Sequence, residues 1–124
     1  MKIIAFDIDD VLCYRDKIHE QKGIEKYKYC LPIDKNIRLV NECYDNGFYI
    51  KLYTARGMST LKSDVESIKE NLLPITEQFL EKNNVKYHEL IFGKTHFDLL
   101  IDDKAKNIND INTFEDIKDF LNGE

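Results

Sequence analysis

Three aspartates follow a short apolar run near the start of the chain, in the sequence IIAFDIDDVL at residues 3–12. An apolar run of this kind predicts a buried strand of a parallel sheet, here residues 3–8. Ligands of open α/β sheets bind beyond the carboxyl ends of the strands, where Asp7, Asp9 and Asp10 would lie. Crowding like charges is unfavourable because they repel one another and lose hydration. The cluster therefore predicts a ligand site, and a divalent metal with a phosphate group is the ligand we expect.

The composition limits the classes to which the chain can belong. Its 124 residues suffice for one domain, and 43% hydrophobic with 33% charged residues is typical of a globular protein. The net charge of -5 argues against binding of duplex nucleic acid. No stretch approaches the ~18 apolar residues of a membrane span, and no secretory signal pattern is seen. We expect a single cytoplasmic domain, residues 1–124, that does not bind membranes.

The three cysteines, Cys13, Cys30 and Cys43, are widely spaced and form no C-x-x-C pair. This spacing argues against a zinc site and favours reduced thiols that act as small buried side chains. Cys13 is close enough in sequence to the aspartates to line their site.

Hydrophobic periodicity and turn residues predict strands that alternate with helices. Strands are predicted at residues 3–8, 48–54, 87–92 and 97–101. Helices are predicted from Asp34 as N-cap to Gly47, from Ser59 or Thr60 to a break at Pro74, around residues 76–82, and from Thr113, with Asp116 completing a capping box. Residues 13–32 are predicted to form a loop or short hairpin that could act as a flap over the site.

This order of elements determines the fold class. Parallel strands that are joined by helices require right-handed crossovers. We therefore predict an α/β fold, a three-layer Rossmann-like and mostly parallel sheet without a large cap domain.

Four polar clusters come directly after predicted strands. They are Asp7-x-Asp9-Asp10, Thr54-Ala55-Arg56-Gly57, Gly93-Lys94 and Asp102-Asp103. Because parallel strands end at one edge of the sheet, these clusters can converge on one crevice.

The residue types in the clusters suit phosphoryl chemistry. Asp7 can attack phosphorus to give an aspartyl phosphate, and Asp9 can protonate the leaving oxygen and later deprotonate water. Thr54 can hold phosphoryl oxygens, and Lys94 can offset the charge that develops on them. Mg²⁺ can neutralise the carboxylates, with Asp102-Asp103 as further ligands.

These clusters resemble the four motifs of the haloacid dehalogenase (HAD) superfamily of phosphohydrolases. FDIDDVL resembles the first motif, YTAR the second, Lys94 fits the third, and IDDK is similar to the acidic fourth. The four occur in the family's order and span nearly the whole chain. The resemblance implies an HAD-like fold in which Asp7 is the nucleophile, Asp9 the general acid and base, and Thr54 and Lys94 hold phosphate.

The resemblance also implies a Mg²⁺ site formed by Asp7, Asp9, Asp102 and Asp103. It places Asp103 as the direct ligand of the last pair and Asp102 as its support. More narrowly, YTARGM with GKTHFDLLIDDKA resembles small capless members of capsule and surface-polysaccharide loci, which are presumed sugar-phosphate phosphatases. Asp10 departs from the glycine that is usual there, and we expect it to disfavour very anionic substrates.

Asp10 is expected to shape a turn. Arg56 and residues 27–29 each have two interpretations. Arg56, beside Ala55 in the phosphate-binding turn, could grip a substrate carboxylate or phosphate, or could form a surface salt bridge. Residues 27–29, Tyr-Lys-Tyr, could be a flap that touches substrate or a packed edge.

The function predicted from the sequence is a Mg²⁺-dependent phosphomonoesterase acting on a small phosphorylated metabolite, a sugar phosphate by the resemblance. A nucleotide or polynucleotide 3′-phosphatase is the alternative enzyme. A receiver-like signalling module is a distant alternative, because receivers carry the phosphorylated aspartate after a central strand, where this chain has Tyr53-Thr54. An open site would suit a bulky substrate or a homo-oligomer whose neighbour acts as the cap.

Overall fold

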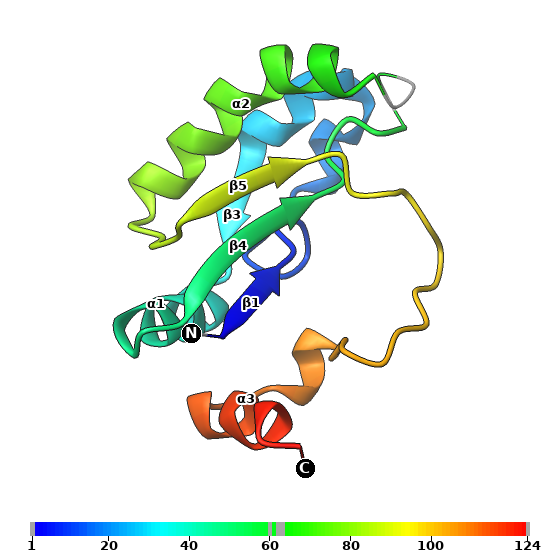
Figure 1. Cartoon of the computed structure of the whole chain (residues 1–124). Helices are drawn as coiled ribbons and strands as arrows, with labels where there is room; N and C mark the ends of the chain where they lie inside the picture. The colour runs from blue at the N-terminus through cyan, green and yellow to red at the C-terminus, as the bar shows by residue number, and fades with distance from the viewer. Residues whose placement is uncertain (1, 60, 62–63, 124) are drawn as a thin grey trace.

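A parallel sheet of three strands forms the centre of the fold in a computed structural model, which describes residues 2–59, 61 and 64–123. The strands β1 (Ile3–Phe6), β4 (Tyr49–Thr54) and β5 (Glu89–Phe92) lie in the order β1-β4-β5. Ile3 pairs with Tyr49 and Thr54 with Phe92, so all three strands end at the same edge (Figure 1). The chain is an α/β protein with a parallel sheet, as its alternating pattern predicts.

One face of the sheet is covered by helices. In β4, Ile50 and Leu52 are fully buried, whereas the alternate residue Tyr53 is 38% exposed. The helices α1 (Asp34–Asp45) and α2 (Val65–Lys82) lie against the buried face, and α3 (Phe114–Leu121) joins the same core. The core side chains of this face include Phe6, Ile37, Val40, Ile50, Leu52, Phe79, Leu80, Phe114 and Ile117.

The parallel sheet with its flanking helices is compatible with the predicted Rossmann-like fold. A sheet covered on both faces would bury successive residues of its strands, whereas β1 leaves Ile3 57% exposed. Phe114 of α3 packs edge-on to Phe48 at a centroid distance of 5.9 Å.

The predicted short hairpin between β1 and α1 is confirmed and is more ordered than a loop. It consists of β2 (Cys13–Arg15), the 3-10 helix η1 (Lys17–Tyr29) and β3 (Cys30–Pro32), with β2 and β3 antiparallel. Tyr27 is buried against Ile68, Leu72 and Phe92, which fastens η1 to α2 and β5. Tyr27 thus belongs to a packed edge.

The helix boundaries differ from prediction in three places. Asp34 is the first residue of α1 and Ile33 is its N-cap, without a side-chain hydrogen bond, so the predicted cap is wrong. Asp64 caps α2 by accepting the Ser67 N–H, so the predicted cap at Ser59 is wrong; its alternative, Thr60, lies outside the described residues. Ile37 and Ile68, in the first turns of the two helices, both face the core.

The predicted break at Pro74 is also wrong, because α2 runs through it as one helix. A proline removes one N–H and frees the carbonyl four residues earlier, which here belongs to Glu70. Both residues are exposed, so water can satisfy that carbonyl. Thr76 and Leu72 on the opposite side remain fully buried and hold the helix to the core.

The predicted fourth strand at residues 97–101 is not formed. The chain between β5 and the 3-10 helix η2 (Ile108–Asp110) has no regular structure and arches away from the sheet (Figure 1). Leu99 is 75% and Ile101 is 88% exposed. An apolar run forms a strand only where its backbone can pair with a neighbouring strand. The Lys94 N–H still donates to the Thr54 carbonyl, but residues 97–101 pair with none of the described strands.

The capping box predicted for α3 is confirmed. The Thr113 side chain accepts the Asp116 N–H, and the Asp116 carboxylate accepts the Thr113 N–H. Within the part of the chain that the structure describes, no helix is both long and apolar enough to cross a bilayer.

Candidate active site

Three of the four predicted clusters meet at the carboxyl edge of the sheet. Asp7 follows β1, Thr54 ends β4, and Lys94 comes two residues after β5. Because β4 lies between β1 and β5, Thr54 lies between Asp7 and Lys94 along this edge. The long Lys94 side chain nevertheless spans β4, and its ammonium lies 3.2 Å from Asp7 Oδ2. The sheet therefore brings together residues that are distant in sequence, as the parallel topology predicts.

Local hydrogen bonds fix both members of this ion pair. Asp7 Oδ1 accepts the N–H of Ile8 at 2.8 Å, which holds the carboxylate against its own turn. The Lys94 N–H donates to the Thr54 carbonyl at 3.1 Å, and its ammonium lies 5.3 Å from the centre of the Phe97 ring. The Asp7 side chain is 35% exposed and that of Lys94 17%, so Asp7 remains open to a ligand.

Thr54 and the two residues after it form a tight turn. The Thr54 hydroxyl is fully buried and accepts the N–H of Arg56 at 3.0 Å. Ala55 lies between them, and its carbonyl accepts the N–H of Met58. The Thr54 hydroxyl can still donate its own proton, but by accepting the Arg56 N–H it mainly stabilises this turn.

Asp10 occupies a turn, as predicted. Its φ of +66° lies in the left-handed region, which Asp tolerates better than most residues. Its N–H donates to the Cys13 carbonyl at 2.7 Å, and its side chain is exposed.

Arg56 points inward to Asp9 and is not a surface residue. Its side chain is fully buried, and Nε lies 3.1 Å from Asp9 Oδ2 while Nη2 lies 3.1 Å from Oδ1. Nη1 donates to the Thr76 hydroxyl at 3.0 Å, and the Tyr27 ring stacks 4.8 Å from Cζ. Burial alone would lower the pKa of Arg56, but the Asp9 carboxylate outweighs it and raises that pKa.

This arrangement favours neither of the two predicted roles for Arg56. Its donors are used within the protein, so the side chain positions Asp9 and leaves no free fork for a substrate. Arg15 adds a second cation to Asp9, 3.1 Å from Oδ1, and also pairs with Glu20 at 3.0 Å.

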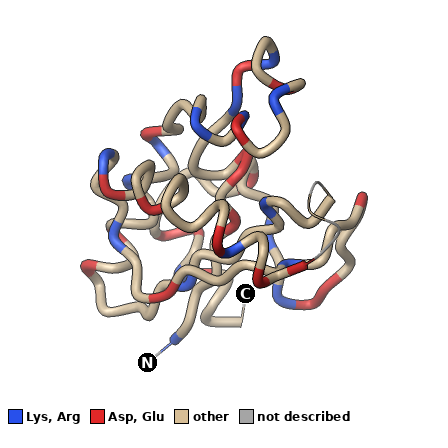
Figure 2. Tube along the Cα trace, turned by 90° about the horizontal axis from the view of Figure 1, so that it is seen from above, with Lys and Arg blue, Asp and Glu red and all other residues tan. Residues whose placement is uncertain are grey.

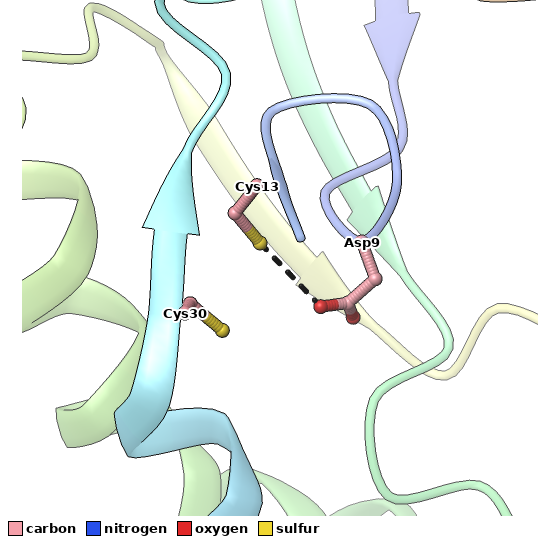
Figure 3. Close-up of side chains that lie close together, drawn as sticks. All are labelled: Asp9, Cys13 and Cys30. Carbon is pink, nitrogen blue, oxygen red and sulfur yellow. Dashed lines mark hydrogen bonds between the residues drawn. The ribbon is translucent and has the colours of Figure 1, made fainter. Parts of the chain in front are cut away.

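Two thiols complete the surroundings of Asp9 (Figure 3). Arg56 Nη2 donates to Cys13 Sγ at 3.4 Å and to Cys30 Sγ at 3.1 Å. Cys13 Sγ lies 3.6 Å from Asp9 Oδ1, as the dashed line in Figure 3 marks. A hydrogen bond with Cys30, together with burial, raises the pKa of Cys13. The matching hydrogen bond from Cys13 and the charge of Arg56 lower the pKa of Cys30.

The fourth cluster lies on the exposed loop. Asp102 Oδ1 accepts the Lys104 N–H at 3.0 Å, and this bond lowers the pKa of Asp102. Asp102 lines a cavity of about 490 Å³ beside β1, together with Asp7 and Lys94. Asp103 is exposed and does not line this cavity.

The residues fit a magnesium site in their chemistry but not in their arrangement. Carboxylate oxygens are the ligands that Mg²⁺ prefers. Within residues 2–59, 61 and 64–123, however, the one group of three acidic, thiol or imidazole ligands that could hold an ion is Asp9, Cys13 and Cys30, whose sulfur content suits a softer metal. The side chains of Asp7, Asp102 and Asp103 do not form such a group.

Arg15, Cys30 and Thr76 were not predicted from the sequence as partners in the site. Arg15 and Cys30 belong to the hairpin, whose pairing has no strong local signal, and Thr76 lies 20 residues from Arg56. The Asp9–Arg56 pair did have a signal, because an acid and an arginine follow two strands that are expected to be neighbours.

Comparison with known proteins supports the architecture and does not identify a function. The structure is similar to the crystal structure of a structural genomics target from Vibrio cholerae, with a TM-score of 0.79 and 29% sequence identity over 100% of both chains. No protein-family model matches the chain. A search of curated proteins gave no significant match.

Proposed function

We propose that this chain is a phosphomonoester hydrolase that acts through an aspartyl phosphate on a small phosphorylated metabolite. The observation that supports this most is the Asp7–Lys94 ion pair of 3.2 Å at the ligand-binding edge of the sheet. A carboxylate nucleophile needs a nearby cation, because negative charge accumulates when it approaches a phosphate. The resemblance of the same residues to HAD motifs agrees with this chemistry.

In the proposed reaction, Asp7 attacks phosphorus, and the P–O bond to the leaving group breaks as the bond to Asp7 forms. The leaving oxygen takes a proton from Asp9. Asp9 is held by Arg56 and Arg15, and among the described residues Arg15 alone of the two has a second carboxylate partner, Glu20. The contact between Asp9 and Arg15 is therefore the one that can be exchanged for a substrate. Water then attacks the aspartyl phosphate, loses a proton to Asp9 and releases phosphate.

Mg²⁺ is part of the proposal as the expected cofactor, with Asp7, Asp9, Asp102 and Asp103 as expected ligands, and these carboxylates would have to draw closer together to share the ion. When bound, it would neutralise the negative charge of the carboxylates and the phosphate. Its requirement can be tested apart from the nucleophile, by removing divalent ions with EDTA and restoring either Mg²⁺ or Ca²⁺. We expect Mg²⁺ to restore activity and Ca²⁺, which accepts longer bonds and looser geometry, to restore it poorly.

The substrate class follows from charge and from the open site. Basic and acidic residues are interspersed along the chain trace in the view of Figure 2, and the net charge is -5. This argues against polynucleotides, which require a basic groove. We propose that the substrate is a sugar phosphate of polysaccharide biosynthesis, with a nucleotide 3′-phosphate as the alternative. We expect the enzyme to act in the cytoplasm.

The receiver alternative is disfavoured by the central strand. β4 lies between β1 and β5 and ends in Tyr53-Thr54, so its end offers no aspartate to phosphorylate.

The hairpin of residues 13–32 packs on α2 through Tyr27, so it is not a free flap over the site. We therefore expect either a bulky substrate that fills the open site or a second subunit that covers it.

The proposal is tested by phosphate release from a panel of sugar phosphates, nucleoside 5′-phosphates and nucleoside 3′-phosphates in Mg²⁺. We expect turnover of at least one sugar phosphate and the highest kcat/KM within that class. Highest turnover of the 3′-phosphates would favour the alternative enzyme. No release from any member, combined with a long-lived phosphoprotein after treatment with acetyl phosphate, would contradict hydrolysis and favour a receiver.

A further inference from the structure

We propose that Cys13 and Cys30 form a peroxide-sensitive thiol pair that closes to a disulfide beside Asp9. The two sulfur atoms and an Asp9 carboxylate oxygen lie within 4.8 Å of one another. Figure 3 shows both thiols directed into the same space between the hairpin and the loop that follows β1. The proposal is independent of the phosphatase proposal, because the positions and exposure of the two thiols do not depend on the reaction at Asp7.

The antiparallel register explains why the thiols meet. Cys13 is opposite Pro32, and Cys30 is opposite Arg15, so the two cysteines are diagonal neighbours on one face of the hairpin. A disulfide bond is about 2.05 Å long, so closure requires the sulfurs to approach by less than about 3 Å from their separation within 4.8 Å. Diagonal neighbours of a hairpin lie about 7–8 Å apart, just beyond the usual Cα separation of a disulfide, so closure also requires the two short strands to move closer together.

Arg56 makes this cluster a thiol site rather than a metal site. Its Nη2 lies 3.4 Å from Cys13 Sγ, 3.1 Å from Cys30 Sγ and 3.1 Å from Asp9 Oδ1, so a buried cation already contacts all three potential ligands. A metal ion would have to displace or approach that guanidinium, which Thr76 also holds.

Exposure determines the order of the two steps. Cys30 is partly exposed, whereas Cys13 is fully buried, so Cys30 meets the oxidant. Its sulfur attacks one oxygen of a hydroperoxide, the O–O bond breaks, and the other oxygen leaves as an alcohol or as water with the thiol proton. Cys30 is thereby oxidised to a sulfenic acid and the peroxide is reduced.

The second step closes the pair. Cys13 Sγ attacks the Cys30 sulfur, the S–S bond forms, and the S–O bond breaks. The departing hydroxide takes the Cys13 proton and leaves as water. Asp9 Oδ1, 3.6 Å from Cys13 Sγ, is placed to pass that proton on. Closure removes the thiol donor from Asp9, so the oxidised pair changes the hydrogen bonding of the proposed acid and base.

Cys43 provides an internal control. It is fully buried in α1, and burial raises the pKa of its thiol to about 11. The three cysteines fall in separate tryptic peptides, residues 3–15, 29–35 and 39–51. Peptide mapping can therefore assign oxidation to each cysteine.

The full chain is reduced, treated with hydrogen peroxide, alkylated and mapped without reductant. We expect the peptides 3–15 and 29–35 to appear as one linked species that dithiothreitol separates, with Cys43 alkylated and at least about tenfold slower to oxidise. In Cys13→Ser, Cys30 should stop at a dimedone-trapped sulfenic acid, and in Cys30→Ser the linked species should be lost. Both thiols remaining alkylated after peroxide treatment, or Cys43 oxidising as fast as Cys30, would overturn the proposal. Protection of both thiols by stoichiometric Zn²⁺ would instead identify a metal site and would also overturn it.

Discussion

The Arg56 guanidinium is bound in a forked ion pair to the Asp9 carboxylate, with Nε–Oδ2 and Nη2–Oδ1 distances of 3.1 Å. The pair joins the loop after β1 to the turn after β4 and so links the ends of two neighbouring strands. Buried ion pairs contribute little net stability, because desolvation opposes the Coulomb attraction. Their loss is nevertheless costly when a single partner is left behind.

Replacing Arg56 with methionine should therefore destabilise the chain. The Arg56 side chain is fully buried and Asp9 keeps 20% exposure, so Asp9 would be left largely desolvated and with only Arg15 as a cation partner. We expect the free energy of unfolding to fall by about 3 kcal/mol, the low end for a broken buried pair. Arg38→Met, at an exposed site on α1, is the matched control and should change it by less than about 0.5 kcal/mol. Urea unfolding measures both, and equal effects would contradict the role of Arg56.

The turn after Arg56 requires a glycine. Gly57 has a φ of +79°, and a Cβ there would lie 2.8 Å from Leu72 Cδ1 and 3.0 Å from Ile68 Cγ1. Gly47 has a φ of +90°, and a Cβ there would meet no atom within 4 Å, so Gly47 isolates the backbone contribution. We expect Gly47→Ala to cost about 1–2 kcal/mol of unfolding free energy and Gly57→Ala about 1–3 kcal/mol more. Thermal unfolding that shows the same loss for both variants would contradict the packing at Gly57.

The capping box of α3 predicts a pH dependence of stability. Asp116 accepts the N–H of Asn112 at 2.8 Å and that of Thr113 at 3.1 Å, and these bonds lower its pKa in the folded state. A lowered folded pKa stabilises the protein above the unfolded value of about 3.9, and this stabilisation is lost as the pH falls through the folded pKa. Wild type should exceed Asp116→Asn in stability at about pH 7, and the difference should shrink at about pH 3. A difference that is unchanged between these pH values would contradict the assignment.

The loop of residues 97–101 offers a test of the sheet itself. Ile101 is 88% exposed, whereas Ile50 in β4 is fully buried. Ile101→Ala should change the free energy of unfolding by less than about 0.5 kcal/mol, and the control Ile50→Ala should lower it by about 2–5 kcal/mol. A loss at Ile101 as large as that at Ile50 would show that this segment is a buried strand after all.

The sequence predicted most of the elements because their signals are local. The apolar spacing of Ile37 and Val40, and the Thr113–Asp116 capping box, specify helices without reference to the rest of the chain. The strand predicted at residues 97–101 was wrong because pairing depends on a partner edge that is distant in sequence. The break predicted at Pro74 was wrong because the cost of a proline depends on whether water reaches the freed carbonyl, which only the fold determines.

The site was predicted in the same uneven way. Asp7, Thr54 and Lys94 could be placed together because parallel strands end at one edge. The inward orientation of Arg56 could not be predicted, since it depends on Thr76 and on the hairpin that carries Cys30. Long side chains at a strand end can turn either way, and tertiary contacts decide between the two.

The central claim is that Asp7 is the nucleophile of a phosphohydrolase, and hydrolysis of an aryl phosphate in Mg²⁺ tests it most directly. Asp7→Asn should abolish turnover while the unfolding transition is retained, because an amide cannot form the aspartyl phosphate. Asp10→Asn makes the same chemical change three residues away, in an exposed turn whose left-handed φ asparagine tolerates, and should retain activity. Activity in Asp7→Asn equal to that of Asp10→Asn would contradict the account.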